Sequence, residues 1–144
     1  MKRVALIILM LIVCICSMSA CTDIMMTLNE DASIRELDSL AEKHEQAGHR
    51  VVRLGQDEVI SFSESIVAEE GLLLKGALTG MLEYDYTDPQ TGNFTWGVAV
   101  GTRHNDDAKA IAKMYESMGE NLDNVQTKVT NRGLIVEVVY TYTN

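Results

Sequence analysis

The stretch LTGMLEYDYTDPQTGNFTWGVAVG, residues 78–101, decides the fold that we expect from this sequence. It contains two runs of alternating side chains, separated by residues 88–93, which hold the only proline of the chain and a glycine. Alternation with a period of two is typical of a strand, and proline with glycine is typical of a turn. The stretch therefore predicts a β-hairpin.

The second strand of this hairpin has one bulky face and one nearly bare face. The bulky face consists of Phe94, Trp96, Val98 and Val100. The bare face consists of Thr95, Gly97, Ala99 and Gly101. Small side chains let another element approach closely, and we expect the helix that follows, residues 106–118, to cover the bare face. Gly119 is expected to end that helix.

Outside this hairpin, periodicity predicts two further helices and three further strands. Ser33 and Glu36 have the spacing of a capping box, so a helix is expected to start at Ser33 and to end before Gly48. The remaining elements are a strand at 50–54, a helix at 57–70, and a second hairpin of 122–130 and 134–143. The predicted fold is a single α+β domain, in which a mainly antiparallel sheet of two hairpins packs with about three helices.

The N-terminus has the order of a secretory signal. Lys2 and Arg3 precede an apolar run of residues 4–16, which is shorter than the roughly 20 residues that a transmembrane helix needs. Small and polar residues then lead to Cys21. We therefore predict a signal peptide at 1–20, a tether at 21–32 and a globular domain at 33–144.

The four residues Met18-Ser19-Ala20-Cys21 resemble the recognition sequence of bacterial lipoproteins. The resemblance implies cleavage before Cys21, attachment of diacylglycerol to its sulfur, and fatty acylation, for example by palmitate, of the new amino group. Thr22 stands where aspartate favours retention in the inner membrane, so the outer membrane is the expected location. The alternative is a secreted protein in which Cys21 occurs by chance.

Charge excludes two classes of partner. The chain has a formal net charge of −9, and loss of Lys2 and Arg3 with the leader changes it to −11. Binding to nucleic acid depends on basic residues that neutralise phosphates, and adhesion to anionic lipid headgroups depends on basic clusters. We expect neither nucleic acid nor charged headgroups as a partner.

The chain offers few residues in patterns that support catalysis. His44 and His49 are five positions apart, whereas the helical zinc-protease motif needs a spacing of four, and no metal site is expected. The glycine-rich residues 71–80 lack the lysine and hydroxyl of a phosphate loop, and the nucleophile elbow is absent from the sequence. We predict a protein that is not an enzyme and has no cofactor, with a hydrolase whose site is scattered along the chain as the alternative.

Four aromatic residues near the first turn, Tyr84, Tyr86, Phe94 and Trp96, form the candidate binding patch. Core packing is the simpler interpretation of these residues. The functional interpretation is an exposed aromatic patch at the end of the hairpin, because aromatic side chains serve as binding anchors.

Residues 76–101, followed by an alanine-rich helix, resemble small envelope lipoproteins of the LPP20 type. This resemblance implies a non-catalytic protein that acts by assembly in the cell envelope. We therefore predict a membrane-anchored envelope lipoprotein with a structural role or an envelope protein as its partner. The alternative is a periplasmic or surface module that binds a small ligand or glycan through the aromatic hairpin.

Overall fold

The computed structural model describes residues 25–143, which form three helices and a five-stranded antiparallel sheet. The N-terminal helix covers residues 25–46 in the described part of the chain. The other elements are β1 (Arg50–Arg53), α2 (Gln56–Glu69), β2 (Gly80–Thr87), β3 (Phe94–Gly101), α3 (Asn105–Glu120), β4 (Val125–Asn131) and β5 (Ile135–Tyr142). The predicted α+β fold is confirmed, including both hairpins.

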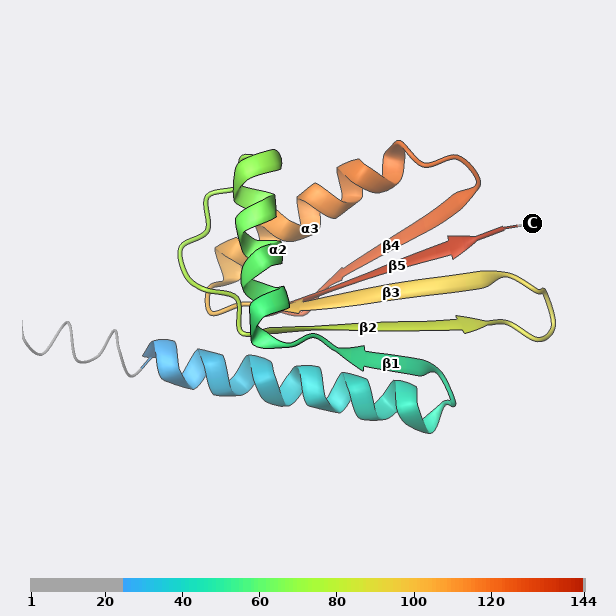
Figure 1. Cartoon of the computed structure of the whole chain (residues 1–144), viewed down its shortest axis with the longest axis horizontal. Helices are drawn as coiled ribbons and strands as arrows, with labels where there is room; N and C mark the ends of the chain where they lie inside the picture. The colour runs from blue at the N-terminus through green and yellow to red at the C-terminus, as the bar shows by residue number, and fades with distance from the viewer. Residues whose placement is uncertain (1–24, 144) are drawn as a thin grey trace, which may run out of the picture.

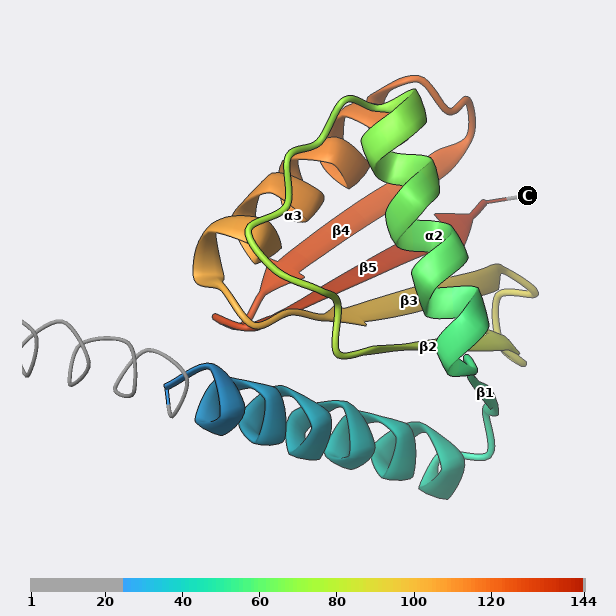
Figure 2. The ribbon, with the colours of Figure 1, turned by 60° about the vertical axis from the view of Figure 1, so that its left-hand side comes forward.

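The strands are ordered β1-β2-β3-β5-β4, so that the two predicted hairpins lie side by side in one sheet. The N-terminal helix covers one face of this sheet, and α2 and α3 cover the other (Figures 1 and 2). β5 lies inside the sheet, and both of its faces are covered.

The face under α2 and α3 contains the larger apolar core. Val98, Val100, Val136 and Val138 project from the sheet, and Ile111 of α3 packs against them with its side chain fully buried. On the opposite face a smaller cluster joins Leu37, Leu40 and Ala41 of the N-terminal helix to Leu82, Tyr84, Ala99 and Ile135. Most of the apolar burial therefore lies between the sheet and the two later helices.

The N-terminal helix begins earlier than the sequence predicted. Residues 25–32, expected as a tether, are already helical, and Ser33 lies inside the helix. The Ser33 hydroxyl is within hydrogen-bond distance of the Glu30 carbonyl oxygen (3.1 Å) and of Thr79 Oγ1 (2.5 Å). Ser33 thus joins the helix to the loop before β2 instead of capping a helix start, because its side chain is fully buried against that loop.

The bare face of β3 is covered by the N-terminal helix, not by α3 as predicted. A Cβ atom at Gly101 would lie 2.8 Å from Leu37 Cδ1, and one at Gly97 would lie 2.1 Å from Tyr84 Cζ. α3 packs instead on the bulky face, where its apolar stripe meets the valines of β3 and β5. The prediction of close approach was right, but it assigned the wrong helix.

Gly119 does not end α3, which continues to Glu120. Gly119 is buried against β4, where an added Cβ would lie 2.3 Å from Thr127 Oγ1. The residue therefore serves close packing between helix and strand, and the helix ends one residue later.

Candidate functional site

The site begins where the N-terminal helix ends and the chain turns back toward the sheet. Gly48 has a φ of +80°, a conformation that favours glycine. The amides of Gly48 and His49 donate to the carbonyls of Glu45 and His44, both at 3.0 Å. This turn brings the two imidazoles together, with 2.9 Å between His44 Nδ1 and His49 Nδ1.

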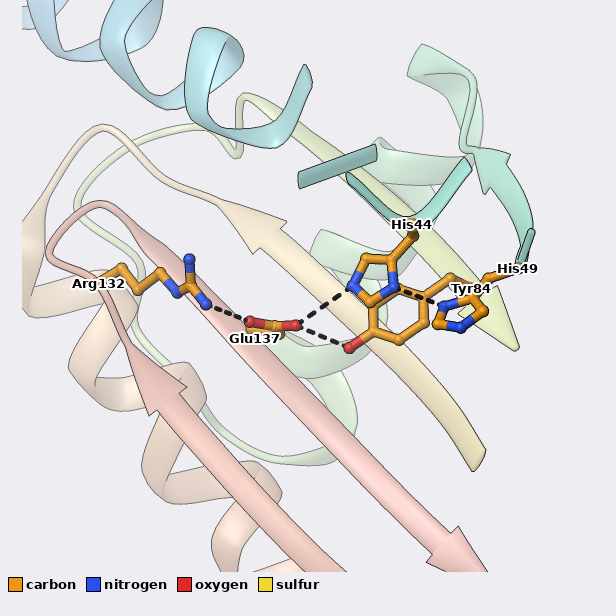
Figure 3. A network of polar contacts seen from close by, with 5 residues as sticks. All are labelled: His44, His49, Tyr84, Arg132 and Glu137. Atoms are coloured by element: carbon orange, nitrogen blue, oxygen red, sulfur yellow. Dashed lines mark hydrogen bonds and ion pairs between the residues drawn. The ribbon is translucent and has the colours of Figure 1, made fainter. Parts of the chain in front are cut away.

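Glu137 of β5 is the centre of the polar network that these histidines join (Figure 3). The Tyr84 hydroxyl donates to Glu137 Oε1 at 2.7 Å, and Arg132 Nη2 donates to Glu137 Oε2 at 3.0 Å. His44 Nε2 lies 3.7 Å from Oε1, which is within ion-pair range but long for a hydrogen bond. The network therefore connects the N-terminal helix with β2, with β5 and with the β4–β5 turn.

Ring stacking holds the same residues in place. The His44 and Tyr84 rings stack with centroids 3.6 Å apart, and His49 stacks on Tyr86 at 3.9 Å. Tyr84 in turn rests on Gly97, the bare residue opposite it in β3. The glycine is required here, because any side chain would displace the tyrosine ring.

Burial sets the protonation preferences of the network. Loss of solvent lowers the pKa of His44 below its ordinary value, and the nearby His49 and Lys43 act in the same direction. The Glu137 carboxylate acts against them but does not reverse the shift. Burial and the hydrogen bond to Glu137 raise the pKa of the Tyr84 hydroxyl, which therefore stays a donor at all physiological pH values.

One tautomer of neutral His44 suits this geometry. With its proton on Nε2, His44 presents an N–H toward Glu137, and its Nδ1 accepts a hydrogen bond from His49 Nδ1. The opposite tautomer would place a lone pair of Nε2 against the carboxylate. When His44 carries both ring protons, its Nδ1–H donates and His49 Nδ1 accepts.

We call this network the latch; it consists of hydrogen bonds and ion pairs among His44, His49, Tyr84, Arg132 and Glu137. Within residues 25–143 the ring nitrogens of the histidines form no hydrogen bond to a serine, threonine or aspartate side chain. The nearest hollow, about 540 Å³, is bordered by residues 47–49 and 85–90 and is reached from the network only through His49. Over the same residues no group of three or more potential ligand side chains is arranged for a metal ion.

The four predicted patch residues do not gather on one surface. Tyr84 is buried, with 2% of its surface exposed, and Tyr86 stacks on His49 on the face of the N-terminal helix. Phe94 and Trp96 lie on the opposite face, where Trp96 stacks on Tyr140 and Phe94 remains 41% exposed. The register pairs Tyr84 with Gly97 and Tyr86 with Thr95, so each tyrosine shares a face with the bare side of β3.

Sequence reasoning did not find the histidine pair. A spacing of five within one helix separates two side chains by roughly 140°, and Gly48, before which we expected the helix to end, lies between the two histidines. That glycine is the reason for the contact, because it reverses the chain after the helix. A histidine on either side of a helix-ending glycine is the signal that could have indicated the pairing.

Comparison with known proteins does not assign the chain to a family. No protein-family model, curated protein or solved structure matches the chain. Cys21 and the leader lie outside the described residues, and the two resemblances in the sequence stay predictions. Within the described range no helix is both long and apolar enough to cross a bilayer.

Proposed function

We propose that this protein is a non-catalytic lipoprotein of the bacterial cell envelope, anchored through Cys21, whose domain binds another envelope protein. The observation that carries the proposal is the closeness of a fixed helix to the predicted anchor. Only residues 22–24 stand between Cys21 and the first described helical residue, Met25. These four residue steps span at most about 14 Å even when fully extended.

Two exposed apolar side chains of the helix support a position at the membrane surface. Met25 and Leu28 have 59% and 57% of their surface exposed, and their spacing of three places them on the same side of the helix. Apolar side chains beside a lipid anchor add burial at the interface between headgroups and acyl chains. The first described turn of the helix thus suits contact with the lipid that the acyl chains of Cys21 would enter.

The helix is fastened to the domain along its length. Near its start, Asn29 Nδ2 donates to the Arg103 carbonyl at 3.0 Å, and Arg103 pairs with Glu30 at 2.8 Å. Near its end, His44 joins the network around Glu137. Because both ends are attached, an anchor at Cys21 would hold the whole domain at the membrane, with little freedom to swing away from it.

The polar network, the hollows and the aromatic residues favour a binding role over catalysis. In the latch, Tyr84 and Arg132 donate to the two oxygens of the Glu137 carboxylate, and the hollows beside α3 and beside His49 open to solvent. The aromatic residues that would form a glycan site are divided between two faces of the sheet. The outer membrane remains the expected location because Thr22 follows the cysteine.

The test is the substitution Cys21→Ser in the full chain, followed by membrane fractionation and intact mass. We expect loss of the acyl mass, retention of the leader or cleavage elsewhere, and release of the cleaved protein from the membrane fraction. Cys16→Ser is the matched control, because Cys16 leaves with the leader and its loss should change neither result. An unchanged mature mass and unchanged fractionation for Cys21→Ser would refute the proposal.

A further inference from the structure

Among residues 25–143, β4 pairs with β5 alone and forms an edge of the sheet. The Arg132 amide donates to the Ile135 carbonyl, and the Thr143 amide donates to the Asn124 carbonyl. In an antiparallel ladder bonded and non-bonded pairs alternate, so Gln126, Lys128 and Thr130 bond to β5. The backbone groups of Val125, Thr127 and Val129 therefore point outward, away from the sheet.

The same three residues line a groove beside α3. It has a volume of about 380 Å³, with Val125, Thr127, Val129 and Gly119 among its lining residues. Glu116 and Glu120, both exposed on α3, complete the lining. The groove is therefore apolar where it meets β4 and acidic where it meets the helix.

Val125, Thr127 and Val129 thus have outward-pointing backbone groups and also line the groove with their side chains. An extended segment that paired antiparallel with β4 would bond to the backbones of Val125, Thr127 and Val129. Its residues directly opposite these three would project to the same face, into the groove beneath α3. Its alternate residues would lie beside Gln126 and Lys128, which are exposed on the other face.

We propose that β4 binds an extended, basic segment of another protein, which adds to the sheet as a sixth strand. The inference rests on the proposed protein-binding role. Arginine or lysine fits the groove positions, because its aliphatic stem can cover Val125 and Val129 while its cation meets Glu116 and Glu120. Threonine or another β-branched residue fits the alternate positions.

A second copy of this chain is the less suitable occupant. Twofold pairing centred on β4 would oppose Lys128 with Lys128 and would bring the glutamates of two α3 helices together. Like charges directly opposite one another destabilise a strand pair. A net charge of −11 after loss of the leader adds to the repulsion between copies.

The opposite edge of the sheet lacks the features that favour binding at β4. β1 has only four residues, Arg50–Arg53, and arginine occupies both of its ends. Short edge strands with charged side chains are a common protection against strand addition. β4 has seven residues and a groove alongside it.

The test measures fluorescence anisotropy of a labelled eight-residue peptide in which threonine and arginine alternate. A peptide of four threonines followed by four arginines is the control, because it has the same charge but cannot direct all arginines to one face. The full chain, purified in detergent, should bind the alternating peptide at least about tenfold more tightly, since only that peptide satisfies groove and backbone together.

Two variants separate the backbone contribution from the charge contribution. Val129→Pro removes one outward N–H and no bond to β5, so it should weaken binding about tenfold or more, whereas Val129→Ala should retain most of it. Glu116→Gln with Glu120→Gln should also weaken binding, and Glu69→Gln with Glu70→Gln, at the C-terminal end of α2, is the matched control. Circular dichroism and thermal unfolding establish that each variant is folded.

Equal binding of the two peptides would overturn the inference. So would an unchanged affinity for the alternating peptide in both the folded Val129→Pro variant and the double glutamine variant. A dimer that is lost in Val129→Pro and excludes the peptide would also overturn it, because β4 would then serve a second copy. The anchor is tested separately by Cys21→Ser, which should leave peptide affinity unchanged. Failure of one test is thereby distinguishable from failure of the other.

Discussion

The face of the sheet beneath α2 and α3 is covered by an apolar core, whereas the face beneath the N-terminal helix combines a small apolar cluster with a polar network. The first face buries the valines of β3 and β5 against Ile111. The second face buries Glu137 and His44, which hydrophobic contact alone would not bring together.

The difference teaches that the two helical layers are held by different forces. Apolar burial contributes stability in proportion to area and does not depend on protonation. A buried polar network contributes only while each donor and acceptor keeps its partner. The attachment of the N-terminal helix, which is the layer closest to the predicted anchor, therefore responds to substitutions in the polar network and to pH.

The largest effect should come from the apolar face. Ile111→Ala removes a fully buried side chain from the centre of that core and should lower the free energy of unfolding by about 2–5 kcal/mol. Urea denaturation followed by circular dichroism measures it. Ile60→Ala on α2 is the control, since Ile60 is half exposed and should cost far less. Equal costs for the two variants would contradict the assignment of the core.

An intermediate effect should come from the centre of the latch. Glu137→Gln keeps the shape of the side chain but removes the charge that Arg132 and His44 face, and should cost about 1–3 kcal/mol. Hydrogen exchange should quicken most in residues 34–46. Glu64→Gln, an exposed position on α2, should stay within about 0.5 kcal/mol of the parent. Uniform acceleration of exchange across the sheet would argue against a separate helix layer.

The smallest effect should be the pH dependence of the same layer. The pKa of His44 is lowered in the folded state, so the unfolded chain takes up its proton first as the pH falls. The stabilisation that comes from neutral His44 is complete above the unfolded pKa of about 6.5 and decreases as the pH falls below that value. The free energy of unfolding should change by at most about 1.4 kcal/mol per pH unit.

Chemical denaturation at pH 7.5 and at pH 5.5 measures this slope. His44→Gln should reduce this slope. A steeper slope in His44→Gln would mean that the Glu137 carboxylate outweighs burial at this site.

The fold could be predicted from the sequence because its strands carry clear local signals. The turn at residues 88–93 and the alternation on both sides of it fix the first hairpin, and Gly133 with the flanking valines indicates the second. Which helix covers which face depends on the path of the chain between elements. Periodicity does not report that path, and this is why the bare face of β3 was assigned to α3.

The candidate site could not be predicted, since its members are distant in sequence. Glu137 appears in the sequence only as a charged residue in an apolar strand, and nothing local indicates that Tyr84 and His44 will reach it. The start of the N-terminal helix was missed for a related reason. Ser33 and Glu36 match a capping box, but tertiary contact with Thr79 places Ser33 in a helix interior.

The contact between Tyr84 and Gly97 provides a spectroscopic reporter within the fold. The tyrosine ring lies directly over the glycine backbone, at the position where a side chain would otherwise stand. Aromatic ring currents displace the resonances of nuclei above the ring, so the α-protons of Gly97 should appear well upfield in a proton spectrum. A return of the Gly97 α-proton resonances toward ordinary chemical shifts would show that the N-terminal helix has separated from the sheet.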